Sequence, residues 1–146
     1  MTVHLIKLSV GSESIESLAE WHRSRLALRR SRGEPAELWH RTRMFPRRRD
    51  EILDGGSIYW VIKGVILARQ EIVALRGVTC ADGIRRCDIV LERTLHPVRP
   101  TPRRAFQGWR YLAPEDAPPD LTGADADAFT SLPSGMRSEL AELGLV

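Results

Sequence analysis

Cysteine, lysine and long apolar runs are all scarce in this sequence, and each shortage excludes a class of protein. Two cysteines, Cys80 and Cys87, in 146 residues are too few for a disulfide-stabilised scaffold and are typical of a reducing compartment. No apolar stretch approaches the ~20 residues that span a bilayer, and the first residues lack the basic and apolar regions of a signal peptide. The sequence therefore predicts a soluble cytoplasmic protein with no membrane partner.

Catalytic and metal-binding motifs are also lacking. The sequence has no phosphate-binding Gly-x-x-x-x-Gly-Lys-Ser/Thr loop, no Gly-x-Gly-x-x-Gly fingerprint, no Gly-x-Ser-x-Gly elbow and no His-Glu-x-x-His pair. The four histidines are scattered, so no close ligand pair starts a zinc site. We therefore expect no metal, no cofactor and a non-enzymatic function. A Cys–His dyad that meets only in space remains an alternative.

The periodicity of apolar residues predicts one α+β domain with a curled or barrel-like mixed sheet and a long N-terminal helix. The helix follows Ser12 or Ser14 and stops at Gly33. The remaining expected elements are a first strand at 3–10, a strand at 38–45, a short helix at 46–53, a fully buried strand at 58–62, one or two strands within 65–79, and a partner strand at 84–93.

The hairpin turn at Asp82-Gly83 sets an expected register. If the loop has two residues, Cys80 faces Arg85 and Cys87 faces Val78. The two thiols are then not opposed, which argues against a disulfide.

Proline divides the end of the chain from the rest. Six of the nine prolines fall within residues 96–119, which we expect to be an extended strap across the sheet and not a strand interior. We place one domain at residues 1–112, including the strap, and an acidic C-terminal tail at 113–146 with a short helix near 133–143.

Charge is distributed unevenly along the chain. Residues 1–110 hold 21 Lys and Arg against 12 Asp and Glu, whereas residues 111–146 hold one Arg against seven acids. All the basic residues except Lys7 and Lys63 are arginine, whose planar fork contacts phosphates and base edges. A genomic bias toward arginine codons is the alternative. The tail either keeps the protein soluble or folds over the arginines and competes with nucleic acid.

The candidate nucleic-acid-binding residues are arginines with aromatic residues among them. A basic surface with exposed rings can follow a phosphate backbone and stack a base. Alternatively, residues 47–49 form a solvated helix face paired with Asp50 and Glu51, and Arg69 and Gln70 form an exposed strand end and not a pocket mouth. The candidates are Trp39, Arg41, Arg43, Arg47, Arg48, Arg49, Tyr59, Arg69, Gln70, Arg103, Arg104 and Trp109.

Two stretches carry resemblances to known families. Residues 53–64 (LDGGSIYWVIKG) with 106–112 (FQGWRYL) resemble an uncharacterised bacterial family of small single-domain proteins, which implies no activity. The opening strand followed by residues 14–18 (SIESL), and then Trp39, a glycine turn and two strands, is similar to EVE- and ASCH-type domains of the PUA-like superfamily. That similarity implies a small β-barrel that binds RNA or modified DNA bases in an aromatic pocket.

The functional hypothesis is therefore a PUA-like module that binds RNA or modified-base DNA. One alternative is a small enzyme or binder for an anionic metabolite, held by Arg69, Gln70 and Lys63. Another is an adaptor that docks on proteins or on a second copy through an exposed Phe106 and Trp109.

Overall fold

The computed structural model describes residues 2–9, 13–104, 106 and 108–121. The fold is α+β, and a mixed sheet forms most of it. Along the chain the elements are β1 (His4–Leu8), α1 (Ile15–Ser31), β2 (Leu38–Thr42), α2 (Arg49–Leu53), β3 (Ser57–Ile62), β4 (Val65–Thr79), β5 (Arg85–Leu91), β6 (His96–Pro102), β7 (Trp109–Leu112) and the 3-10 turn η1 (Pro114–Asp116).

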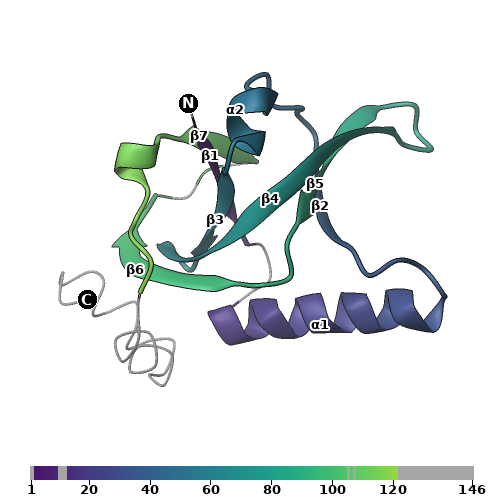
Figure 1. Cartoon of the computed structure of the whole chain (residues 1–146), viewed down its shortest axis with the longest axis horizontal. Coiled ribbons are helices and arrows are strands. Elements are labelled where there is room, and N and C mark those ends of the chain that lie inside the picture. Colours follow the sequence, from purple (N-terminus) through teal and green to yellow (C-terminus); the bar gives the residue numbers. More distant parts are fainter. Residues whose placement is uncertain (1, 10–12, 105, 107, 122–146) are drawn as a thin grey trace.

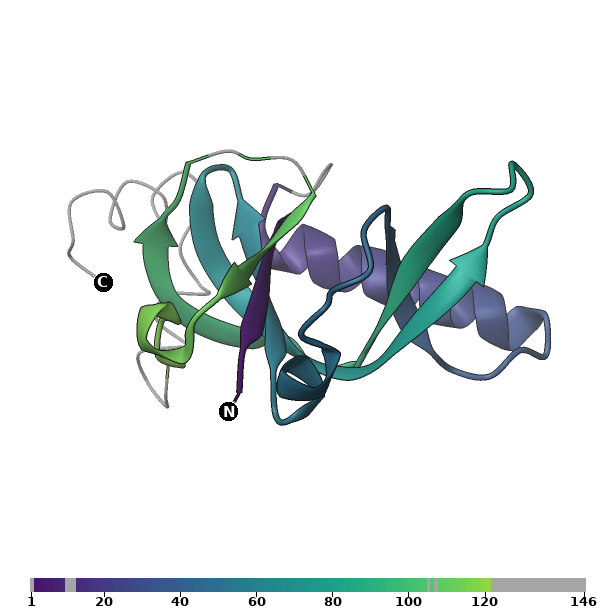
Figure 2. The same cartoon turned by 90° about the horizontal axis from the view of Figure 1, so that it is seen from above.

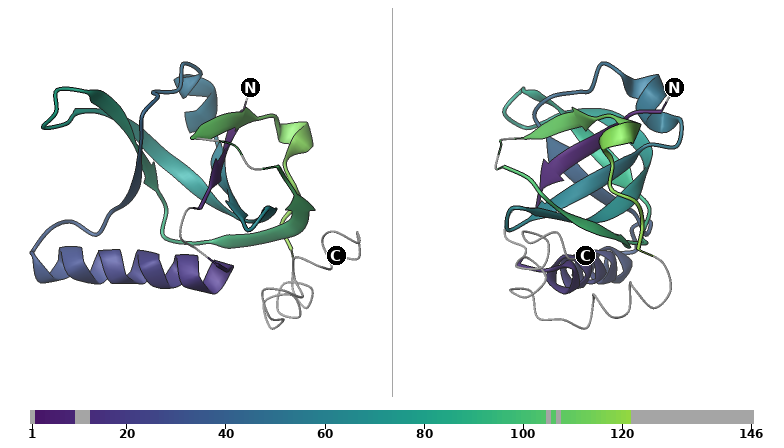
Figure 3. Two further views of the ribbon diagram at one scale, coloured as in Figure 1. Left: turned by 180° about the vertical axis from the view of Figure 1, so that it is seen from behind. Right: turned by 90° about the vertical axis from the view of Figure 1, so that its left-hand side faces the viewer.

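Strand β4 organises the seven-stranded sheet. Its first half lies between β3 and β6, and its second half pairs with β5 after a register shift between Ile72 and Ala74. The strand order is β2-β5-β4-β3-β1-β7, with β1 parallel to β3 and antiparallel to β7. The sheet curls strongly, yet it is not closed (Figure 3). The expected curled sheet is thus present without closing into a barrel.

Strand β3 lies at the centre of the core, as the apolar run at 58–62 predicted. All six of its residues are buried. Trp60 packs with Ile58 and Ile62 in the larger core beside α1, whereas Tyr59 and Val61 pack in a second cluster on the opposite face. Burial on both faces explains why this strand is apolar throughout.

Helix α1 lies along one side of the curled sheet (Figures 1 and 3). It begins after Ser14, whose Oγ accepts from the Ser17 N–H at 3.1 Å while the Ser17 Oγ accepts from the Ser14 N–H at 3.0 Å. This reciprocal cap satisfies two backbone donors. Ile15, Leu18 and His22 form the buried side of the helix.

The β4–β5 hairpin differs from the expected register by one residue. Cys87 pairs with Gly77, not with Val78, and the loop contains three residues, 81–83. The reason is Gly83, whose φ of +80° supplies the left-handed residue of a three-residue hairpin loop. Both cysteines are free, so the expected absence of a disulfide between them is confirmed. The hairpin projects away from the rest of the sheet (Figure 2).

The proline-rich strap contains two strands, so the expectation that it holds no strand interior was wrong. β6 takes an outer position where it pairs with β4 alone, and prolines are tolerated on such strands. Beyond η1, the chain returns along β6: Asp120 forms a bridge with Val98, and the Leu121 N–H donates to the Pro97 carbonyl at 3.0 Å. The helix expected near 133–143 lies outside the described residues.

No helix among the residues described here is both long and apolar enough to cross a membrane.

A buried polar pair links three parts of the sheet. The Trp60 indole N–H donates to the Gln70 Oε1 at 2.8 Å, and the Gln70 Nε2 donates to the Glu92 carbonyl at 2.8 Å. Trp60 and Gln70 are both completely buried. Gln70 therefore satisfies the only polar atom of the largest core side chain.

Replacing Gln70 with leucine tests this link. Gln70→Leu keeps the side chain nearly the same size but leaves the Trp60 N–H without an acceptor, so we expect a loss of about 1–3 kcal/mol of unfolding free energy. Urea unfolding followed by tryptophan fluorescence measures it. Val73→Thr, at a half-exposed position of the same strand, is the control and should shift the midpoint far less. Equal midpoints for Gln70→Leu and the wild type would contradict the assignment.

Candidate functional site

Of the predicted arginines between residues 41 and 49, two form ion pairs and three do not, among the residues that the structure describes. Arg41 forms a two-point ion pair with the buried Asp88: Nε lies 2.7 Å from Oδ1 and Nη2 lies 3.1 Å from Oδ2. Arg48 pairs with Glu51, as the helix-face alternative expected for that residue. Within the described part of the chain, Arg43, Arg47 and Arg49 are exposed and form no ion pair. These three supply uncompensated positive charge.

Several other predicted residues have structural roles. Gln70 is completely buried and fully bonded, so it cannot line a pocket mouth. Tyr59 is 5% exposed, and Trp109 is 9% exposed with its N–H donated to the Met44 carbonyl at 3.0 Å. The expected exposure of Tyr59 to a ligand, and of Trp109 to a partner, was therefore wrong.

Arg69 is also occupied. Its Nε and Nη2 each lie 2.7 Å from an Asp120 carboxylate oxygen, and its Nη1 donates to the Ser57 Oγ at 3.0 Å. The Arg69 guanidinium lowers the pKa of the Asp120 carboxyl below its usual range. An acid of the predicted tail thus covers one predicted arginine, and Arg69 is not available to an anionic ligand in this arrangement.

The strap arginines border a shallow groove of about 700 Å³. Arg103 and Arg110 lie 6.0 and 5.6 Å from the centre of the Phe106 ring, and Arg104 completes the basic rim.

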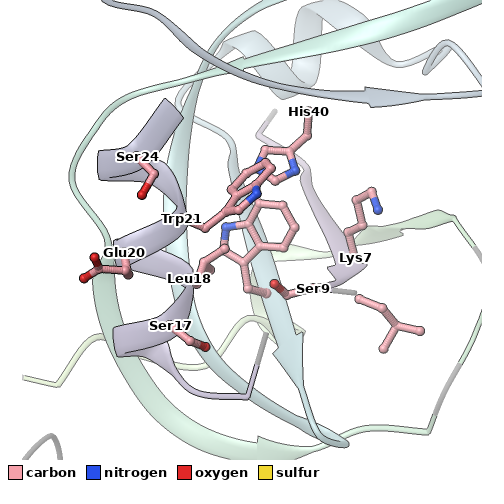
Figure 4. A pocket seen from close by; sticks show the side chains of 10 residues that line it. Lys7, Ser9, Ser17, Leu18, Glu20, Trp21, Ser24 and His40 are labelled. Atoms are coloured by element: carbon pink, nitrogen blue, oxygen red, sulfur yellow. The ribbon is translucent and has the colours of Figure 1, made fainter. Parts of the chain in front are cut away.

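A better-formed cavity lies between α1 and the sheet. It has a volume of about 530 Å³, within the range of roughly 300–1,000 Å³ that small-molecule sites occupy. Figure 4 shows the Trp21 and His40 rings meeting within it, with Lys7 on the side away from the helix. The residues that line it are Lys7, Leu8, Ser9, Ser17, Leu18, Glu20, Trp21, Ser24, His40 and Trp60.

Four elements contribute side chains to this cavity, which we call the ring cavity. The His40 ring on β2 lies 4.6 Å from the Trp60 ring on β3 and 4.9 Å from the Trp21 ring on α1. Lys7 reaches in from β1, where it is in register with Trp60. Trp60 is completely buried, whereas Trp21 is 41% exposed. The three contacting rings therefore extend from the core at Trp60 to the solvent at Trp21.

Two histidines, His22 on α1 and His40 on β2, contact each other at the ring cavity. The Nε2 atoms of His22 and His40 lie 3.1 Å apart, so one carries the hydrogen and the other accepts it. Burial, and then neighbouring positive charge, lowers the pKa of His22 to about 4 and that of His40 to about 3. Both imidazoles are therefore neutral at physiological pH.

A series of stacked side chains leads out of the ring cavity. The Arg25 guanidinium lies 4.7 Å from the centre of the Trp21 ring and 4.6 Å from that of Trp39. Arg41 follows at 5.0 Å from the Trp39 ring. We call Trp21, Arg25, Trp39 and Arg41 the tryptophan–arginine stack. Each neighbouring pair in the stack makes a cation–π contact, which attracts the guanidinium to the ring.

The chemistry of these groups suits binding better than catalysis. Imidazoles with pKa values of about 3 and 4 are weak bases at neutral pH. Burial raises the pKa of the Cys87 thiol to about 11, which disfavours the nucleophilic thiolate of a Cys–His dyad. Among the described residues, no three His, Cys, Asp or Glu side chains come together to hold a metal ion.

Sequence reasoning missed the ring cavity and half of the tryptophan–arginine stack. Trp39 and Arg41 of the stack were predicted, but Trp21 and Arg25 were not, and neither were Lys7 and His40 of the cavity. The four-residue spacing of Trp21 and Arg25 on the helix was a usable signal for part of the stack. Lys7 and His40 gave none, since only the long-range pairing of β1 with β3 and of β2 with β5 brings them together.

Comparison with known proteins identifies the family. The family model described as a protein of unknown function, DUF1489, matches residues 5–146, so the chain belongs to that family. The expectation of an uncharacterised family is confirmed. Neither the curated proteins nor the solved structures gave a match.

The neutral histidine pair predicts how stability depends on pH. The unfolded chain binds protons at these histidines near pH 6.5, whereas the folded chain does so only near pH 4 and 3. Stability should therefore be full above about pH 6.5 and fall between about pH 6.5 and 5, before most carboxylates titrate.

Urea midpoints measured from about pH 7.5 to 5 check this dependence. His22→Leu removes one member of the pair, and its midpoint should fall less steeply with pH than that of the wild type. Val73→Thr, which replaces no titratable group, is the control and should retain the wild-type slope. A wild-type midpoint that stays level or rises as the pH falls to 5 would rule out the neutral pair.

Proposed function

We propose that this member of the DUF1489 family is a non-enzymatic module that binds an unpaired base of RNA, or a modified base of DNA, in the cytoplasm. One observation carries the proposal: Trp21 both lines the ring cavity and belongs to the tryptophan–arginine stack. A base would enter the cavity beside Trp21 and His40. The strand on either side of it would follow the arginines.

Stacking supplies the first part of the binding energy. Trp21 is 41% exposed although its ring contacts both His40 and Arg25, so part of its indole surface is open to a ligand. Stacking of a base on an aromatic side chain is worth about 1–3 kcal/mol and accepts any base, because each has a π-face.

Arginine supplies the second part. Arg25 lies over both the Trp21 and the Trp39 rings, which holds its guanidinium in place, whereas Arg41 is paired with Asp88 and contributes ring contact with Trp39. Arg43, Arg47 and Arg49 add exposed positive charge. Neutralising phosphates releases counterions, so binding through these residues must weaken as salt increases.

The resemblance to PUA-like domains is consistent with this proposal. Those domains are small β-barrels that bind RNA or modified bases in an aromatic pocket. The present sheet is open, but it curls beside a helix (Figure 3). The ring cavity is lined by residues of both. We extend the proposal to a PUA-like architecture on these grounds.

Titration with labelled single-stranded RNA and DNA at several salt concentrations tests the proposal. We expect micromolar or tighter binding whose logarithm falls linearly with log salt, by about 0.7 for each phosphate contacted. Trp21→Ala should weaken binding by about tenfold, because one stacking face is lost. Arg25→Gln should weaken binding and also reduce the salt slope by about 0.7.

Arg99→Gln provides a matched control. Arg99 is an exposed arginine on β6, outside both the stack and the ring cavity. Arg99→Gln removes the same charge as Arg25→Gln, but at a position outside the proposed binding surface. It should therefore leave the affinity nearly unchanged. Absence of binding at low salt would disprove the proposed function. Equal losses for Arg25→Gln and Arg99→Gln would mean that net charge alone attracts the strand.

A further inference from the structure

Lys7 brings a positive charge to the ring cavity. The side chain is half-buried, and burial lowers the pKa of its ammonium group. Across the part of the chain that the structure describes, no carboxylate lies within ion-pair distance of Lys7. A partly desolvated ammonium group with no acceptor is unfavourable, so this site favours a ligand that supplies one.

Two other polar groups of the cavity, Glu20 and His40, already have partners within the protein. Glu20, the one acid of the lining, is directed to Arg23, and their atoms lie 2.8 Å apart. Figure 4 places Glu20 and Lys7 on opposite sides of the cavity. His40 already uses its Nε2 with His22, and the positive charge of Lys7 helps to keep His40 neutral.

Lysine is a donor of three hydrogens with no acceptor. A flat ring between Trp21 and Lys7 is therefore favoured when its edge carries a carbonyl oxygen. Guanine presents O6 beside N7, and thymine and uracil present O4, whereas adenine has no carbonyl oxygen and its amino group lies between the ring acceptors N1 and N7. The amino group of adenine would face the ammonium group donor to donor.

We propose that Lys7 makes the ring cavity selective for bases with an exposed oxo group, guanine above all and then thymine or uracil, over adenine. This inference rests on the proposed function, because it assumes that a base occupies the cavity.

Single strands built of abasic spacers with one central base test the selectivity. All of them carry the same phosphates, so differences in affinity come from the base. The wild type should bind strands with guanine or thymine at least about fivefold more tightly than the adenine strand. Lys7→Met keeps the aliphatic length but removes the charge, and it should abolish that preference. Lys63→Met is the matched control, because Lys63 is exposed at the β3–β4 turn and is the only other lysine.

A second measurement uses the unmodified protein and so does not depend on a variant that folds. Acetylation of the lysines, followed by peptide mass spectrometry, should show Lys7 protected by the guanine strand and Lys63 not protected. Equal protection of both lysines would overturn the inference, as would a guanine preference that persists in Lys7→Met.

The outcomes also separate this inference from the proposed function. If no strand binds, with or without a base, the proposed function fails. If strands with a base bind better than the abasic strand but guanine and adenine are equal, the base site stands and the role of Lys7 is disproved. Guanosine monophosphate should bind at least about tenfold more weakly than the guanine strand, since it lacks the neighbouring phosphates. Equal affinity would mean that the neighbouring phosphates contribute nothing, which contradicts the proposed contact of the strand with the arginines.

Discussion

The hydrogen bond from Trp60 to Gln70 is the constraint on which the site depends. Trp60 is the largest completely buried side chain, and its indole N–H must find an acceptor inside an apolar sheet. Gln70 provides that acceptor and is itself anchored to the Glu92 carbonyl. With its ring orientation fixed, Trp60 supports His40, and His40 in turn contacts Trp21. The orientation of the exposed Trp21 ring therefore depends on the buried Trp60 ring, through His40.

The polar groups of the site differ in charge. His22 and His40 share one hydrogen bond and stay neutral, so they add shape and rigidity but no charge. Lys7 keeps a charge within the cavity, and the arginines carry charge outside it. This separation of a ring site from a charged path is the arrangement that proteins use to bind single strands, where stacking holds bases and cations follow the backbone.

Local patterns predicted the α+β class and the buried strand at 58–62, because apolar periodicity is a local property. The hairpin register was wrong by one residue, since the sequence Asp82-Gly83 suits both a two-residue and a three-residue loop. Gln70 was expected either at a pocket mouth or at an exposed strand end, and only its distant partners Trp60 and Glu92 reveal its buried role. The ring cavity depends on pairings between strands far apart in sequence, which no local pattern specifies.

The tryptophan indole signals report most directly on whether the ring cavity and the tryptophan–arginine stack form one binding surface. The four tryptophans give four indole N–H resonances in a proton–nitrogen NMR spectrum. On addition of a short single strand, the signals of Trp21 and Trp39 should shift, while that of Trp109, bonded to the Met44 carbonyl, should not. Shifts confined to Trp109, or no shift in Trp21 and Trp39 with the strand bound, would contradict the account.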